Sequence, residues 1–89
     1  MAKYSVRLKA SAVREIEQIE PKKVRRQIVN RIGALAEDPR PPGCEKLSGQ
    51  SNLYRVRQGA YRIVYAVEDD VLVVFVVKVG HRSAVYRTK

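Results

Sequence analysis

Hydrophobic and polar residues alternate along the chain with two different periods, which predict strands and helices. In residues 4–8 (YSVRL) apolar and polar side chains alternate with a period of two, which is typical of a half-buried strand. Ser11 is in position to cap a following helix. The apolar side chains expected to share one face of that helix are Val13, Ile16 and Ile19. The N-terminal part is therefore predicted to be a strand followed by a helix.

A second helix is predicted after Pro21, which marks a break in the chain and the first turn of the new helix. Its apolar side chains recur at helical spacing, at Val24, Ile28, Ile32 and Leu35. Asp38 and Pro39 are expected to end this helix. Residues 39–51 (PRPPGCEKLSGQS) are rich in proline and glycine, which predicts a long loop toward the sheet.

Three more strands are predicted in the second half of the chain, at Leu53 to Arg57, Tyr61 to Val67 and Val71 to Val79. The connections between them suit tight hairpins. The last strand is almost entirely apolar, which favours a central place in the sheet. The order β-α-α-β-β-β predicts a single α+β domain over residues 1–89. We expect a mainly antiparallel four-stranded sheet with the two N-terminal helices packed on one face.

Charge points to a polyanionic partner, because 18 basic and 9 acidic residues give a formal charge of +9. Nucleic acid and acidic protein both fit. A membrane surface fits less well, since the basic residues alternate along strands, and the longest apolar run, Val71 to Val77, is too short to span a bilayer. One cysteine, Cys44, excludes an internal disulfide and suits the cytoplasm. With one histidine in the chain, His81, neither a metal site nor a cofactor is expected.

The candidate chemistry lies in arginines on neighbouring predicted strands. Alternation places Arg55 and Arg57 on one face, and Arg62 is expected beside them on the concave, open side of the sheet. After the last strand, His81 and Arg82 are expected to turn toward the same region. Guanidinium groups bind phosphate oxygens through paired hydrogen bonds, so this group suits a phosphate ligand. Alternation alone fits a solvated polar face equally well.

Several segments in this order resemble the RelE branch of the RelE/ParE superfamily of toxins from bacterial and archaeal toxin–antitoxin modules. They are KLSG, YRVR, GAYRIVYAV, the apolar last strand and VGHRSAVY, and the resemblance spans nearly the whole chain. It implies a RelE-like fold and a ribosome-dependent mRNA endonuclease, in which the 2′-hydroxyl of the message attacks the adjacent phosphate. The family's catalytic positions fall on Arg55, Arg57, Arg62, Arg82 and Tyr86. The residues expected to bind RNA are Lys46 and these four arginines.

The expected roles differ among these residues. Arg62 and Arg82 suit stabilisation of the charge that builds on the phosphate oxygens. Lysines are common in the family where Arg55 and Arg57 stand, and an arginine is not an easy general base. Tyr86 either assists proton transfer with a lowered pKa or stacks on a base.

His81 has two interpretations. It is the only side chain whose ordinary pKa suits proton transfer near neutrality, yet a solvated loop histidine is the more frequent case. The basic residues of the second helix are likewise expected to form a solvated face rather than contacts to ribosomal RNA. They are Lys22, Lys23, Arg25, Arg26 and Arg31.

The resemblance and the charge together imply three partners: an acidic antitoxin, the ribosome with mRNA in its decoding site, and ribosomal RNA. A cytoplasmic location follows. Two alternatives remain open at this point. One is a ParE-like toxin that inhibits gyrase without catalysis, and the other is a nonenzymatic RNA-binding module.

Overall fold

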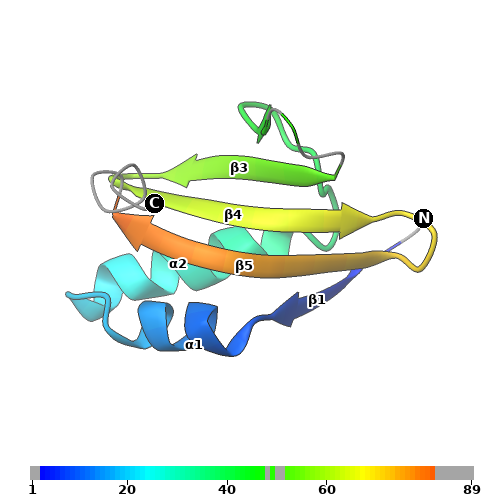
Figure 1. Cartoon of the computed structure of the whole chain (residues 1–89). Helices are drawn as coiled ribbons and strands as arrows, with labels where there is room; N and C mark the ends of the chain where they lie inside the picture. The colour runs from blue at the N-terminus through cyan, green and yellow to red at the C-terminus, as the bar shows by residue number, and fades with distance from the viewer. Residues whose placement is uncertain (1–2, 48, 50–51, 82–89) are drawn as a thin grey trace.

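The computed structural model describes residues 3–47, 49 and 52–81. Its elements are β1 (Ser5–Leu8), α1 (Ala10–Glu17), α2 (Lys22–Ala34), β2 (Glu45–Lys46), β3 (Leu53–Gln58), β4 (Tyr61–Glu68) and β5 (Val73–His81), as Figure 1 shows. The predicted order of the helices and the long strands is confirmed, and the ends of the strands shift by up to two residues. Within the described residues no helix is long and apolar enough to cross a membrane.

The strands form one sheet in the order β1-β5-β4-β3-β2. β1 runs parallel to β5, and the other neighbours are antiparallel, so the α+β class with a mainly antiparallel sheet is confirmed. The expected count of four strands is wrong, because Glu45–Lys46 inside the predicted loop pairs with β3 as a fifth strand. Two charged residues are too short a stretch to show any periodicity.

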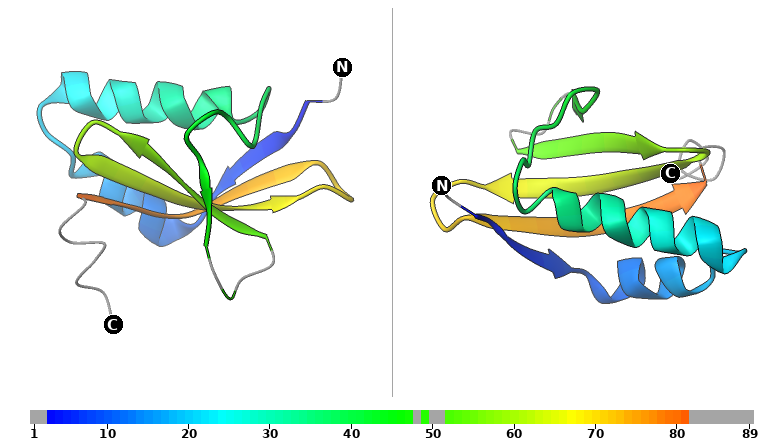
Figure 2. Two further views of the ribbon diagram at one scale, coloured as in Figure 1. Left: turned by 90° about the horizontal axis from the view of Figure 1, so that it is seen from above. Right: turned by 180° about the vertical axis from the view of Figure 1, so that it is seen from behind.

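α2 lies across one face of the sheet, and α1 lies alongside β5 beyond the end of β1, as Figure 1 and Figure 2 show. The predicted apolar face of α2 is confirmed at Ile28, Ile32 and Leu35, each at most 4% exposed. These side chains pack against the helix-facing residues of the long strands, among them Val56 and Ile63. One core therefore fills the space between the helices and the sheet.

The first helix differs from its prediction at its start and on its apolar face. Lys9 occupies the N-cap position without a side-chain hydrogen bond, and Ser11 lies inside the helix. Val13 is exposed, while Ala12 and Ile16 face the core. Ile19 is buried but lies beyond the last helical residue. The helix begins one residue before Ser11, and the spacing of four between Ala12 and Ile16 selects the buried face.

Candidate active site on the arginine face

The pairing of β3 with β4 brings three of the predicted site residues to one face of the sheet. Arg57 lies directly opposite Arg62 in the antiparallel register. Arg55 precedes Arg57 by two residues on β3, and side chains two apart project from the same face. We call Arg55, Arg57 and Arg62 the arginine face. A tight turn at Gly59 and Ala60 fixes this register.

A carboxylate belongs to the same surface. Glu45 on β2 lies directly opposite Arg55 on β3, and the two form an ion pair in which both Nε and Nη2 of Arg55 donate to Oε1 of Glu45. The hydrogen bond and charge of Arg55 lower the pKa of Glu45, and the charges of Arg57 and Arg62 lower it further. All three guanidinium groups therefore act on a single carboxylate.

The three arginines differ in burial. Arg57 is exposed and Arg55 is half-buried, whereas Arg62 is only 6% exposed. The expectation of an open surface is therefore wrong at Arg62. A buried guanidinium sits in surroundings of lower dielectric, where its attraction for an anion is less screened than at an exposed site.

The remaining predicted residues are placed differently. Lys46 lies opposite Tyr54, so alternation places it on the other face of the sheet from Arg55. His81 ends β5 opposite Tyr61, and the two rings meet edge to face with centroids 5.6 Å apart. By the same alternation His81 leaves the sheet on the Tyr61 side rather than the Arg62 side. Arg82 and Tyr86 lie outside the described residues.

Chemically, the arginine face suits a ligand with several anionic oxygens. Guanidinium donors fit phosphate through paired hydrogen bonds and stay charged at every physiological pH. Donors held on a sheet need little rearrangement when charge builds on a reacting phosphate. Among the described residues, no group of three or more His, Cys, Asp and Glu side chains is arranged to hold a metal ion.

Comparison with known proteins shows the family of the chain. Residues 6–86 match the family model described as the ParE toxin of the type II toxin–antitoxin system parDE. The chain belongs to the RelE/ParE superfamily of toxins. It is 32% identical over 85 residues to toxin RelE of Mycobacterium tuberculosis, covering 94% of this chain and 87% of that protein. It is 40% identical over 67 residues to mRNA interferase toxin RelE of Escherichia coli, covering 71% of this chain and 70% of that protein.

The fold of this RelE-like toxin is also found in solved structures. The archaeal RelE in the RelE–RelB complex from Pyrococcus horikoshii aligns with a TM-score of 0.79 and 29% identity, over 92% of this chain and 97% of that one. The isolated Escherichia coli RelE toxin aligns with a TM-score of 0.76 and 33% identity, over 93% of this chain and 90% of that one. The chain is thus a RelE-like member of a toxin–antitoxin system.

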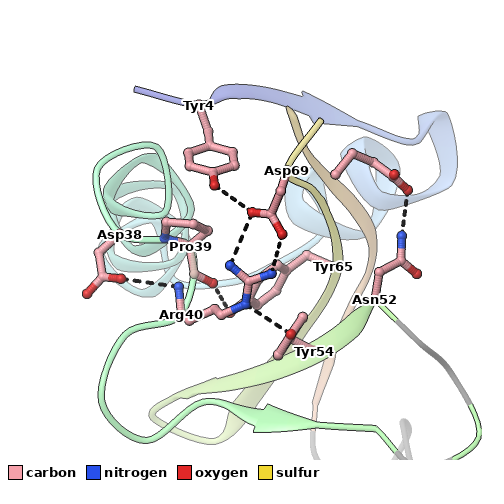
Figure 3. Close-up of polar contacts among 9 residues, drawn as sticks. Tyr4, Asp38, Pro39, Arg40, Asn52, Tyr54, Tyr65 and Asp69 are labelled. Atoms are coloured by element: carbon pink, nitrogen blue, oxygen red, sulfur yellow. Dashed lines mark hydrogen bonds and ion pairs between the residues drawn. The ribbon is translucent and has the colours of Figure 1, made fainter. Parts of the chain in front are cut away.

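Two groups of contacts that support the toxin's sheet were not predicted from the sequence. In the first, shown in Figure 3, Arg40 binds Asp69 through two hydrogen bonds and donates from Nε to the hydroxyl of Tyr54 at 2.9 Å. Tyr4 donates to the same carboxylate at 2.6 Å. These bonds attach the loop before β2 to the start of β1 and to the β4–β5 turn. No local pattern links residues so far apart in sequence.

The second group lies at the outer side of β5. β1 pairs with β5 only from Val73 to Val76. Farther along β5, the carboxylate of Glu15 on α1 provides the hydrogen-bond acceptor at this side of the strand. One carboxylate oxygen accepts the backbone N–H of Val79 at 2.8 Å, and the other accepts from Nζ of Lys78 at 3.0 Å. Gly80, the next residue, lies opposite Arg62, so Glu15 supports the strand beside the arginine face.

Proposed function

We propose that this toxin is an endoribonuclease that cuts messenger RNA in the decoding site of the ribosome. In the reaction, the 2′-hydroxyl of the message attacks the adjacent phosphorus and the bond to the 5′ oxygen of the next nucleotide breaks. The products are a cyclic phosphate and a free 5′-hydroxyl, with one proton leaving the 2′ oxygen and one reaching the 5′ oxygen. The observation that carries this proposal is the cross-strand pair Arg57 and Arg62, with Arg55 beside it.

The chemistry of the arginines and the similarity to known proteins both support this proposal. Negative charge grows on the phosphate oxygens during in-line attack, and fixed guanidinium donors stabilise that charge. Two relatives carry the words mRNA interferase in their names, each 40% identical over 67 residues. In the proposed site Arg62 and Arg82 stabilise the transition state, Arg55 and Arg57 hold the message, and Tyr86 assists in proton transfer or stacks on a base.

His81 is a second candidate for moving a proton, because an imidazole ring can both donate and accept a proton in general acid–base catalysis. Its edge contact with Tyr61 puts its ring at the end of the sheet that carries Arg57 and Arg62. For Lys46, which leaves the other face of the sheet, the proposed role is limited to phosphate contacts at the edge.

The proposed partners are an acidic antitoxin, the ribosome and its RNA, and the proposed location is the cytoplasm. Toxins of this fold have been solved with RelB, including those from Pyrococcus horikoshii and Escherichia coli. A net charge of +9 favours an acidic antitoxin segment on electrostatic grounds.

The test is primer-extension mapping of a message on programmed ribosomes, with a ribosome-free control. The proteins compared are wild type, Arg57→Ala, Arg62→Ala and Arg82→Ala, each checked for folding by circular dichroism. Arg26→Ala is the matched control, since it removes an exposed arginine of α2. The proposal expects cleavage in the decoding-site codon that needs the ribosome and is lost in the three site variants only.

Intact message with folded wild-type protein would remove the proposal. Gyrase inhibition would then be measured by DNA supercoiling, because the matching family model is that of the ParE toxin. RNA binding without cleavage or gyrase inhibition would leave a nonenzymatic RNA-binding module.

A further inference from the structure

We propose that Glu45 is an internal counter-ion of the arginine face, which an RNA phosphate displaces from Arg55 on binding. Glu45 thereby sets how tightly the face binds anions. This inference rests on the proposed function in one respect only, namely that the anion is the phosphate of RNA.

The position of Glu45 in the chain is the first observation. It is the only acidic residue between Asp38 and Glu68, a stretch that holds Arg55, Arg57 and Arg62. The two-residue strand β2 places it directly opposite Arg55, and residues paired in this way share one face of an antiparallel sheet. The sheet therefore places one negative charge directly beside the arginines of this face.

The geometry of the ion pair is the second observation. Nε and Nη2 of Arg55 both donate to Oε1 of Glu45. This edge of a guanidinium group is also one that binds a phosphate with two donors. While the ion pair lasts, the carboxylate oxygen occupies the place of a phosphate oxygen. A phosphate that binds Arg55 through this edge must first move the carboxylate away.

Exposure makes that exchange feasible. The side chain of Glu45 is 57% exposed, whereas that of Arg55 is 22% exposed. The carboxylate can therefore turn into water at small cost while the arginine keeps its place on the sheet. Exposed ion pairs are weak because water and salt screen them, so an incoming phosphate meets a displaceable competitor.

The attraction of the other arginines has the same consequence. Arg57 and Arg62 also lower the pKa of Glu45, after Arg55, because their positive charges attract its carboxylate. A bound phosphate would feel repulsion from that charge as well as competition for Arg55. Glu45 thus weakens the binding of polyanions that contact Arg55 alone. A ligand that also contacts Arg57 and Arg62 gains enough binding energy to displace the carboxylate.

The experiment measures binding of a short single-stranded RNA with 2′-O-methyl sugars, which cannot undergo the attack. Fluorescence anisotropy at moderate salt compares wild type, Glu45→Gln, Arg55→Ala and the double variant. Glu37→Gln is the matched control, because it also removes one exposed carboxylate, the one paired with Lys3, and changes the net charge equally. Thermal unfolding confirms that each variant is folded.

The expected result is RNA binding about two- to fivefold tighter for Glu45→Gln, the size of effect of a screened charge contact. Glu37→Gln should change affinity clearly less. In the Arg55→Ala background, Glu45→Gln should tighten binding much less, since its competitor role needs Arg55. The inference is overturned by unchanged or weaker binding of Glu45→Gln, by an equal gain in Glu37→Gln, or by a full gain without Arg55.

This result is separable from the proposed function, because the assay contains no ribosome and no cleavable bond. Tighter binding by Glu45→Gln with no cleavage of messages on ribosomes would keep the counter-ion role and remove the nuclease. Cleavage by the wild type with unchanged RNA binding by Glu45→Gln would keep the nuclease and remove the counter-ion role.

Discussion

The guanidinium group of Arg40 holds the carboxylate of Asp69 through two hydrogen bonds, 3.2 Å from Nη1 to Oδ1 and 2.8 Å from Nη2 to Oδ2. The same guanidinium carbon lies 5.1 Å from the centre of the Tyr54 ring, where a cation–π attraction adds to the contact. Since Arg40 lies in the loop before β2, this pair fixes one end of the segment that delivers Glu45 to the arginine face.

Replacing Asp69 by Asn should reduce how much the free energy of unfolding falls when the pH is lowered from neutral to acid. The hydrogen bonds from Arg40, and then that from Tyr4, lower the pKa of Asp69 in the folded protein. Such a carboxyl stabilises the fold above its ordinary pKa, and this contribution is lost as the pH falls through the lowered value. Asp69→Asn should be less stable than wild type at pH 7 and lose less stability toward acid.

Urea unfolding at a series of pH values from neutral to acid measures this difference. Asp70→Asn is the control, since Asp70 follows in the same turn and makes none of these contacts. An acid limb as steep in Asp69→Asn as in wild type would show that the carboxylate adds nothing to folding.

Tyr65→Phe should destabilise the toxin at neutral pH and change its alkaline limb. The hydroxyl of Tyr65, which is fully buried, donates to the carbonyl oxygen of Pro39 at 2.8 Å. Losing this bond should cost about 1 kcal/mol of unfolding free energy. Burial also raises the pKa of Tyr65, so its contribution is present below pH ~10 and falls as the pH rises further.

Denaturant unfolding at pH 7 and in the alkaline range tests both parts. Tyr61→Phe, on the same strand but half-buried, is the control. Equal stability of wild type and Tyr65→Phe at pH 7 would contradict the predicted cost of the lost hydrogen bond. Equal loss of stability at alkaline pH in the two proteins would contradict the predicted effect of the raised pKa.

Glu15→Ala should open the outer side of β5. It removes the acceptor of the Val79 N–H, and Val79 is 2% exposed, so the amide is left without that partner. A buried donor without a partner costs about 1–3 kcal/mol. Glu15→Gln should cost less, because its amide oxygen can still accept from Val79 while the ion pair with Lys78 is lost.

Hydrogen exchange followed by NMR measures this at the residue concerned. The Val79 amide should exchange faster in Glu15→Ala than in Glu15→Gln, and more slowly in wild type than in either. Unchanged exchange at Val79 in Glu15→Ala would mean that another group satisfies the amide.

The order of elements was predictable because its signals are local. Period-two alternation marks β3 and β4, and the spacing of Ile28, Ile32 and Leu35 marks the buried face of α2. β2 was not predictable, since Glu45–Lys46 are charged and become a strand only by pairing with β3. Arg40 with Asp69 and Glu15 with Val79 escape sequence analysis because each pair joins distant segments.

The candidate site was predictable to the extent that alternation governs it. Arg55, Arg57 and Arg62 share a face because residues two apart on a strand, and residues opposed across a hairpin, do so. The burial of Arg62 was not predictable, because alternation gives a face but not what covers it. One sequence feature pointed to the proposed role of Glu45, which is the only acidic residue between Asp38 and Glu68.

Gly59→Ala should destabilise the hairpin that sets the arginine pair. Gly59 has φ +60° at the first position of the two-residue turn, a conformation that costs other residues about 1–2 kcal/mol. A Cβ atom there would meet no other atom within 4 Å, so the cost is backbone strain alone. Gly33→Ala in α2, where space is also open and φ is ordinary, should instead stabilise by about 0.5–1 kcal/mol. Urea unfolding should therefore show a lower free energy of unfolding for Gly59→Ala and a higher one for Gly33→Ala. Stabilisation by Gly59→Ala would exclude strain at the turn.

Arg57→Ala and Arg62→Lys should separate catalysis from folding if the proposed nuclease is correct. Arg57 is exposed, so its truncation should leave the melting temperature close to that of wild type. Arg62 is buried, and lysine keeps its charge and much of its length but not the paired donors. Each change removes a donor from the phosphate, and loss of one such donor typically slows a reaction by about a hundredfold or more.

Single-turnover cleavage on programmed ribosomes, with melting temperatures measured in parallel, provides the comparison, and Arg26→Ala on α2 should match wild type in both. A wild-type rate in Arg57→Ala would remove that residue from the site. A rate in Arg62→Lys equal to wild type would show that charge alone suffices at this position, because lysine supplies the charge without the guanidinium geometry.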